Sequence, residues 1–219
     1  MSAAQEASPG VLRVVLADDH AVVRTGYRRL LELEDDMQVV ADFSDSDSTC
    51  QWFSSHQADV LVLDLSMPGR GGLEALARVK ARRPELKVLI FSMHDNPAMV
   101  AQALKAGADG YLTKSSEPDA LIDAVRQVAR GGRALSPDIA GALAGEGGQA
   151  AHLILSPREF EIFRLLAAGR TVEEIATRLF LSAKTVANYQ TGIRQKTGLA
   201  TTLDMYRHAE AHRLLDGSE

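Results

Sequence analysis

Scarce residue types exclude several classes of protein. The 219 residues include a single cysteine, Cys50, so the chain can form no internal disulfide and offers no thiol cluster to a metal. No apolar run approaches the roughly 18 residues that a membrane span needs. The amino-terminal stretch MSAAQEASPG lacks the basic start and the apolar core of a signal peptide. We therefore expect a cytoplasmic protein with no membrane contact.

Basic residues are also fewer than acidic residues. The chain has 24 lysines and arginines against 29 aspartates and glutamates, a net charge of −5, within an ordinary globular composition of 46% hydrophobic residues. From residue 150 onward there are nine basic and eight acidic residues, which leaves 15 basic and 21 acidic residues before it. The length suits two modest domains, and the charge divides an acidic front part from a nearly neutral back part.

The front part alternates two periodicities. Five short runs rich in β-branched residues are separated by segments in which apolar residues recur at helical spacing. The runs are VLRVVLA, MQVVADF, DVLVLDL, KVLIFS and DGYLTK. Strands that alternate with helices predict a parallel sheet covered on both faces. We predict an α/β domain with a doubly wound, five-stranded parallel sheet in flavodoxin-like order.

The back part has no such strands. Helix starts occur at SPRE and TVEE, each with Ser or Thr three residues before Glu, and a third occurs at SAKT. The short turn FLSAK joins the second and third predicted helices, which is typical of a helix-turn-helix whose later helix enters the major groove of DNA. We predict domains at 1–131 and 153–219, joined by a partly helical linker at 132–152.

Three carboxylates end the first and third predicted strands. Asp18 and Asp19 follow the first strand, and Asp64 follows the third. In doubly wound sheets the ligand site lies at the carboxyl ends of the strands, and flavodoxin-like order makes these two strands neighbours. Carboxylates crowded in a partly dry site repel one another, and a hard divalent cation with oxygen ligands, most often Mg²⁺, relieves the repulsion. The sequence therefore predicts an open magnesium site.

Groups that suit a phosphate end the next two strands. The fourth strand ends in Ser92, and the fifth carries Tyr111 and Lys114. Lys114 would supply a compact positive charge, and Ser92 a hydroxyl donor, to phosphate oxygens held at the metal. In this setting Asp64 can act as a nucleophile on phosphorus.

These elements resemble the receiver domain of bacterial response regulators. Residues 11–131 carry ADDH, DLSMPG, FS and YLTK where that family has its acidic pair, phosphoacceptor, hydroxyl switch and lysine. The resemblance implies that a sensor histidine kinase donates the phosphoryl group. It also implies roles for six residues: Asp64 as phosphoacceptor, Asp19 as a direct metal ligand, Asp18 as a ligand mostly through water, the Ser66 backbone carbonyl as another ligand, and Ser92 with Tyr111 as the switch pair.

The back part is similar to the four-helix output domain of the NarL/FixJ (LuxR-type) transcription regulators. The shared framework comprises Arg158, Glu159, Gly169, Glu174, Ile175, Ala176, Leu179, Ser182, Thr185 and Val186. The resemblance implies promoter DNA as a partner and a homodimer formed on phosphorylation, with the last helix in the dimer contact. It also allows a contact with RNA polymerase.

The predicted recognition helix carries little basic charge on its exposed face. The predicted DNA-binding set is Lys184, Thr185, Ala187, Asn188, Thr191, Arg194 and Lys196. The basic members and the helix amino terminus would contact phosphates. Asn188 suits adenine, and Ala187 or Thr191 suits a thymine methyl group.

We do not expect three of the histidines to be metal ligands. His20 follows the acidic pair, but the receiver family does not use this position as a ligand. His208 and His212 lie four residues apart in HAEAH without the order of a metalloprotease motif, and we expect them on a solvated face of the last helix.

Two alternative functions stay open. An Asp-nucleophile phosphohydrolase also forms an aspartyl phosphate on an α/β fold, but it carries a second Asp two residues after the nucleophile, where this chain has Ser66. The other alternative is a DNA-binding protein whose front domain is an unphosphorylated dimerisation module, and the intact acidic site argues against it. We predict a phosphorylation-dependent transcription regulator of a two-component system, and not an enzyme.

Overall fold

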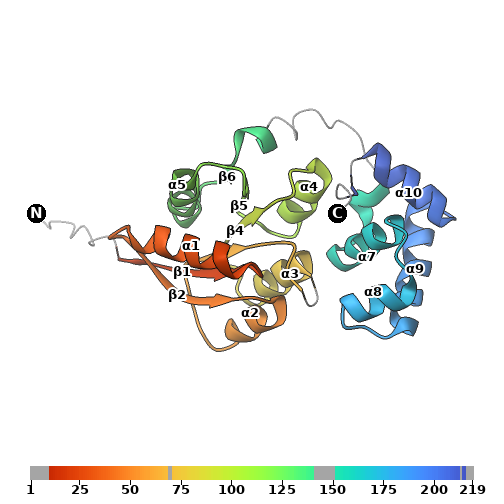
Figure 1. Ribbon diagram of the computed structural model, residues 1–219, viewed down its shortest axis with the longest axis horizontal. Helices are drawn as coiled ribbons and strands as arrows, with labels where there is room; N and C mark the ends of the chain where they lie inside the picture. The colour runs from red at the N-terminus through yellow and green to blue at the C-terminus, as the bar shows by residue number, and fades with distance from the viewer. Residues whose placement is uncertain (1–9, 69–70, 141–150, 213, 216–219) are drawn as a thin grey trace, which may run out of the picture.

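Two domains lie side by side in the computed structural model (Figure 1), which describes residues 10–68, 71–140, 151–212 and 214–215. The front domain is a sheet flanked by helices, and the back domain is helical. Among the described residues, no helix has the length and apolar character needed to cross a membrane.

The sheet is parallel throughout and has the order β2-β1-β3-β4-β5-β6. Its strands are β1 (Leu12–Ala17), β2 (Met37–Phe43), β3 (Val60–Leu63), β4 (Lys87–Ser92), β5 (Gly110–Thr113) and β6 (Ala134–Leu135). The five predicted strands and their flavodoxin-like order are confirmed. The count of five is wrong, because a sixth strand of two residues pairs with β5. Two residues are too few to produce a recognisable alternation in the sequence.

Helices cover both faces of this sheet. They are α1 (Ala21–Glu32), α2 (Ser46–Trp52), α3 (Gly72–Arg82), α4 (Pro97–Lys105) and α5 (Pro118–Ala129). Alternate strand residues point to opposite faces. Val14 and Leu16 pack in one apolar cluster with residues of α1 and α5, whereas Val15 and Ala17 pack in another with residues of α2, α3 and α4. The strands are therefore buried on both sides, as their near-continuous apolar sequences require.

The helical domain contains η1 (Ala151–Ile154), α7 (Pro157–Ala167), α8 (Val172–Arg178), α9 (Ala183–Thr197) and α10 (Thr202–Ala211). Each of the four α-helices begins after a Ser or Thr whose hydroxyl accepts a hydrogen bond from a backbone N–H in the first turn. The caps are Ser156, Thr171, Ser182 and Thr201. The predicted helix-turn-helix is formed by α8 and α9, and Phe180 in their turn adopts a left-handed φ of 52°.

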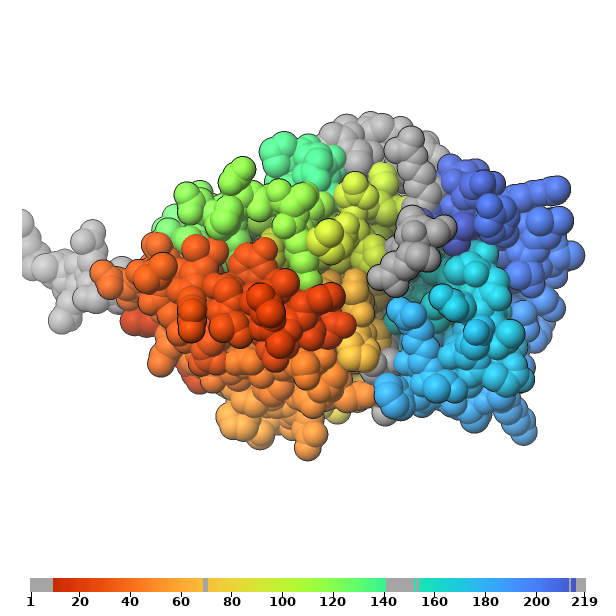
Figure 2. All heavy atoms as spheres, viewed as in Figure 1, coloured from red at the N-terminus to blue at the C-terminus, as the bar shows by residue number. Residues whose placement is uncertain are grey.

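The two domains contact each other through α3 and α4 on one side and α7 and η1 on the other. Figure 2 shows the helical domain, in cyan to blue, seated against these helices of the sheet domain. A single apolar cluster continues across the boundary, with Leu73 and Met99 on one side and Phe160 and Phe163 on the other. The outer face of α9 stays outside this contact (Figure 1).

Candidate functional site

The predicted carboxylates meet at one edge of the sheet. β1 and β3 are neighbours with Ala17 opposite Leu63, and the N–H of Asp64 donates a 2.8 Å hydrogen bond to the Ala17 carbonyl. This register brings Asp18 and Asp64 together immediately beyond the strands. Both are buried, with exposed fractions of 6% and 2%. Two carboxylates so far removed from water require a positive charge beside them.

Lys114 supplies that charge. Its Nζ atom lies 2.6 Å from Asp64 Oδ2 and 2.7 Å from Asp18 Oδ2. Burial alone would lower the pKa of Lys114, but hydrogen bonds to Asp18 and Asp64 raise it above its ordinary value. The lysine is therefore a fixed cation directly beside the predicted phosphoacceptor.

The same edge has the donor set for a divalent metal. Ligand atoms of Asp18, Asp19, His20 and Asp64 lie within 4.8 Å of one another. Asp19 Oδ1 is buried and has no hydrogen-bond partner among the described residues, although the largely exposed ring of His20 places Nδ1 at an ion-pair distance of 2.8 Å. Three carboxylates gathered at one edge, one of them with a buried oxygen that accepts no hydrogen bond from the described residues, fit an oxygen-preferring cation such as Mg²⁺.

The loop after β3 holds the Asp64 carboxylate in place. The backbone N–H of Ser66 donates a 3.1 Å hydrogen bond to Asp64 Oδ1. The hydroxyl of Ser66 lies 3.1 Å from His94 Nε2, which links this loop to the loop after β4. The metal role expected of the Ser66 carbonyl stays a prediction.

The predicted switch pair lies beneath the loop after β4. Ser92 and Tyr111 are both fully buried. The Tyr111 hydroxyl donates a 2.8 Å hydrogen bond to the His94 carbonyl, and Ser92 Oγ accepts a 3.4 Å hydrogen bond from the His94 N–H. Burial raises the pKa of Tyr111, and a hydrogen bond with Ser92 opposes this only in part. Both side chains thus hold His94, whose ring contacts the loop that follows Asp64.

Comparison with known proteins agrees with this geometry. Residues 14–126 match the family described as response regulator receiver domain, and residues 153–209 match bacterial regulatory proteins of the luxR family. The chain is 40% identical to the oxygen regulatory protein NreC of Staphylococcus carnosus over 216 residues, which cover 94% of this chain and all of that protein. The chain belongs to the response regulators that join a receiver domain to a LuxR-type helical domain.

Further relatives share the whole architecture of this response regulator. The transcriptional regulatory protein UhpA of Salmonella typhimurium is 41% identical over 207 residues, which cover 94% of this chain and all of that protein. The solved structure of RcsB from Salmonella enterica serovar Typhimurium, bound to a promoter in the presence of the phosphomimetic BeF3⁻, is 28% identical with a TM-score of 0.67. That match covers 92% of this chain and all of the RcsB chain.

Four of the predicted DNA contacts form one exposed face of α9. Lys184, Ala187, Asn188 and Thr191 are all exposed, and their spacing of three and four residues places them along one side of the helix. The receiver domain does not cover this face. The predicted DNA-binding face of α9 is therefore exposed while the two domains are in contact, which we call the closed arrangement.

The other three residues predicted to contact DNA either form hydrogen bonds within the helical domain or are partly buried in it. Thr185 Oγ1 lies 2.7 Å from the hydroxyl of Ser182, the cap of α9. Lys196 Nζ contacts both carboxylate oxygens of Glu159, at 2.7 and 2.8 Å. Arg194 is half-buried, and its Nε has no hydrogen-bond partner among the described residues. Their role at DNA stays a prediction, and the structure gives Thr185 and Lys196 a role in the fold.

One expectation about the last helix is wrong. His208 and His212 are half-buried rather than solvated, and they form a cluster with the fully buried His152. The sequence pattern missed this cluster because His152 comes from η1, more than fifty positions earlier in the chain. It also gave no signal for the contacts between domains, in which Gln102 donates a 2.8 Å hydrogen bond to the His152 carbonyl.

Proposed function

We propose that Asp64 receives a phosphoryl group from a sensor histidine kinase and that this modification controls binding of the helical domain to promoter DNA. The observation that carries the proposal is the buried arrangement of Asp64, Asp18 and Lys114 at the carboxyl edge of the sheet. The function agrees with the transcription regulators to which the chain is similar.

Each residue at this edge has a part in phosphoryl transfer. Asp64 Oδ1 is held by the Ser66 N–H, so the carboxylate presents a fixed orientation to the incoming phosphorus. Lys114 would move its hydrogen bond from Asp64 to an oxygen of the phosphoryl group and offset the added charge. Asp18 and Asp19 would hold Mg²⁺, with the Ser66 carbonyl as a further ligand. When bound, Mg²⁺ neutralises charge on the phosphoryl oxygens during transfer.

Phosphorylation would act on the domain contact by way of residues near Asp64. The N–H of Gly72, the first residue of α3, donates a 3.3 Å hydrogen bond to the carbonyl of Leu65, the residue after Asp64. On the same helix, Glu74 pairs with Arg158 of the helical domain. A shift of the loop after β3 therefore reaches a residue that holds the two domains together. Ser92 and Tyr111 would report the phosphoryl group to α4 by way of His94.

Release of the helical domain would permit a homodimer on DNA. Two copies of α9 related by a twofold axis would read an inverted repeat with half-sites about one helical turn apart. Doubling the phosphate contacts compensates for the weakly basic helix. Such dimers have precedent in the structure of two RcsB dimers bound to two parallel DNAs. A regulator of this kind would act in the cytoplasm of the cell and can contact RNA polymerase at the promoter.

The phosphohydrolase alternative finds no support in the geometry. A hydrolase needs a proton donor and acceptor beside the nucleophile, and the residue two positions after Asp64 is Ser66, whose hydroxyl contacts His94. We therefore propose a regulator rather than an enzyme, with a receiver domain that extends past the predicted limit of 131 to include β6 (Ala134–Leu135) and a helical domain near 153–219.

Labelling with a small phosphodonor tests the proposed phosphoacceptor. The full-length chain is incubated with acetyl phosphate and Mg²⁺, and the site is mapped by mass spectrometry after reduction of the acyl phosphate with borohydride. We expect Asp64 alone to be labelled, with loss of labelling in Asp64→Asn or without Mg²⁺. Asp59→Asn is the matched control, because Asp59 lies at the opposite end of β3. Labelling that persists in Asp64→Asn would contradict the assignment.

A further inference from the structure

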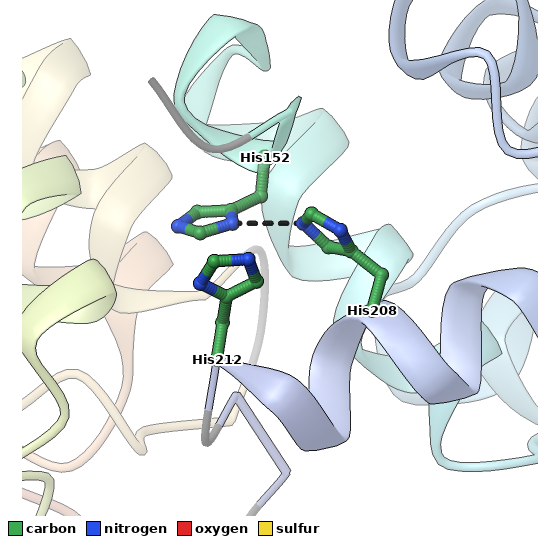
Figure 3. Close-up of side chains that lie close together, drawn as sticks. All are labelled: His152, His208 and His212. Atoms are coloured by element: carbon green, nitrogen blue, oxygen red, sulfur yellow. Dashed lines mark hydrogen bonds between the residues drawn. The ribbon is translucent and has the colours of Figure 1, made fainter. Parts of the chain in front are cut away.

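Three histidines from separate segments converge at the boundary between the domains. His152 lies in η1, His208 in α10, and His212 directly after α10. Figure 3 shows the three imidazole rings facing one another, with the His212 ring below the other two. His152 is fully buried, whereas His208 and His212 are half-buried, so one side of the cluster is open to water.

The spacing of the ring nitrogens suits metal coordination. One ring nitrogen of each histidine can be chosen so that all three lie within 4.8 Å of one another. His152 Nδ1 and His208 Nε2 are 3.1 Å apart. Two nitrogens bound to one tetrahedral Zn²⁺ at 2.0–2.1 Å would lie about 3.3 Å apart. This pair could therefore take up an ion with little movement.

The nitrogen of His152 that faces the other histidines is Nδ1, which lies next to His208 Nε2. The second ring nitrogen, Nε2, points away from His208 and His212 (Figure 3) and has no hydrogen-bond partner among the described residues. Burial and the two neighbouring histidines lower the pKa of His152 to about 4, and burial lowers the pKa of His208. Neutral imidazoles are the form that metals bind.

We propose that His152, His208 and His212 bind one divalent transition-metal ion of the Zn²⁺ class. Three imidazole ligands without a carboxylate suit Zn²⁺, Co²⁺, Ni²⁺ or Cu²⁺ and not Mg²⁺. The half-exposed side of the cluster leaves a fourth position for water. This site is separate from the acidic site at Asp64 and does not depend on phosphorylation.

The metal would strengthen the contact between the domains. The backbone carbonyls of two of its ligands accept hydrogen bonds from the receiver domain. Gln102 of α4 donates to His152 at 2.8 Å, and Asn96, the cap of α4, donates to His212 at 3.4 Å. An ion that ties η1 to the end of α10 fixes both acceptors in position for α4. Bound metal should therefore favour the closed arrangement.

Zinc titration of the untagged, metal-free full-length chain tests this proposal. Mg²⁺ is kept in large excess throughout, so that the acidic site does not take up the probe. Isothermal calorimetry should show one Zn²⁺ per chain. We expect His212→Ala and His208→Gln each to lose at least tenfold in affinity, since even loss of an outer-shell partner typically costs about 10–100-fold. His56→Ala, which removes an exposed histidine of the receiver domain, should bind as the wild type does.

Cobalt provides a second readout for the same variants. Co²⁺ in the wild-type chain should give the intense visible absorption of a tetrahedral ion, and this should be absent from His212→Ala. Circular dichroism of the metal-free variants checks that they are folded. Wild-type affinity in both His212→Ala and His208→Gln would overturn the site. So would the absence of Zn²⁺ binding by the wild type, or an equal loss of affinity in His20→Ala, which would assign the ion to the acidic site.

Discussion

Arg158 Nε lies 3.1 Å from Glu74 Oε2, and this ion pair joins the helical domain to α3 of the receiver domain. Arg158 also donates hydrogen bonds to Glu161 and to the Leu179 carbonyl within its own domain. The arginine therefore stays folded in place whether or not Glu74 is present. Glu74 is the member of the pair whose loss affects the domain contact alone.

Replacing Glu74 should open the domains without phosphorylation. In Glu74→Gln the contact loses a partly buried ion pair, worth on the order of 1 kcal/mol, which corresponds to about a fivefold change in the open population. We expect a larger radius of gyration by small-angle X-ray scattering and a similar gain in the DNA affinity of the unphosphorylated chain. Glu85→Gln, an exposed substitution beyond the carboxyl end of α3, is the control. Equal scattering and affinity in both variants would remove Glu74 from the control of domain opening.

The domain contact should also depend on pH through Glu161. Its carboxylate lies so close to Gly71 of the receiver domain that a Cβ atom there would overlap it. Burial, with a smaller contribution from Glu74, raises the pKa of Glu161 to about 7 despite the neighbouring Arg158. The closed arrangement therefore holds a proton that the open one releases. The stabilisation is fully present below pH about 4.5 and is lost as the pH rises through about 7.

The matched variant for this pH effect is Glu161→Gln, which keeps the shape of the protonated side chain. Near pH 7.5 it should be more closed than the wild type, and the difference between the two should vanish toward pH 5. The comparison isolates Glu161 from the histidine cluster, in which the lowered pKa values of His152 and His208 make acid weaken the contact instead. Scattering curves measured from pH 5 to 8 provide the test. If the difference in radius of gyration between the two proteins were the same at every pH, Glu161 would not control opening.

Two substitutions on the exposed face of α9 should separate affinity from sequence preference. Lys184→Ala removes the side chain that we predict to contact a phosphate, so it should weaken binding to all DNA sequences alike and reduce the slope of log affinity against log salt by about one. Asn188→Ala should relax preference at a single base pair, at a cost of about 1–3 kcal/mol for the preferred base. Band shifts on intact and scrambled half-sites across a salt series measure both effects. The assignment fails if Lys184→Ala changes preference while Asn188→Ala changes the salt slope.

Lys196 should act mainly on stability, in contrast to the phosphate contact predicted from the sequence. Its ammonium group binds Glu159, and this hydrogen bond helps to lower the pKa of the carboxyl against the opposing effect of burial. Because Lys196 is 48% exposed, Lys196→Ala should cost no more than about 1 kcal/mol. A lower unfolding temperature with an unchanged salt slope is expected, with the exposed Gln195→Ala as control. A salt slope reduced by about one would restore the role at DNA.

The sequence was sufficient where chemistry follows from position along a strand. Asp18 and Asp64 could be placed together because parallel strands end at the same edge of the sheet and the flavodoxin-like order that we predicted makes their two strands neighbours. Lys114 was expected at the same edge as a partner of phosphate oxygens, and the structure adds its ion pairs with Asp18 and Asp64. The helix caps could also be predicted, because each depends on residues that are close together in the sequence. Ser156 and Thr171 each precede a Glu that completes a capping box.

Features that depend on how the domains pack could not be predicted in the same way. The pair of Glu74 and Arg158, and the meeting of His152 with His208, join residues from different elements, and periodicity within one segment does not specify such contacts. Lys196 shows the same limit, because its partner Glu159 lies on another helix. From the sequence alone, a lysine on a recognition helix predicts a phosphate contact, because a carboxylate partner on another helix cannot be identified.

We propose that phosphorylation of Asp64 converts a closed chain into a dimer on DNA. Sedimentation velocity tests it most directly, with the full-length chain, Mg²⁺ and a labelled DNA fragment selected from genomic DNA by the phosphorylated protein. With beryllofluoride as the phosphoryl mimic, we predict two copies of the chain on each fragment at concentrations where the untreated chain and Asp64→Asn leave the DNA free. A single copy bound with equal affinity with and without beryllofluoride would contradict the account.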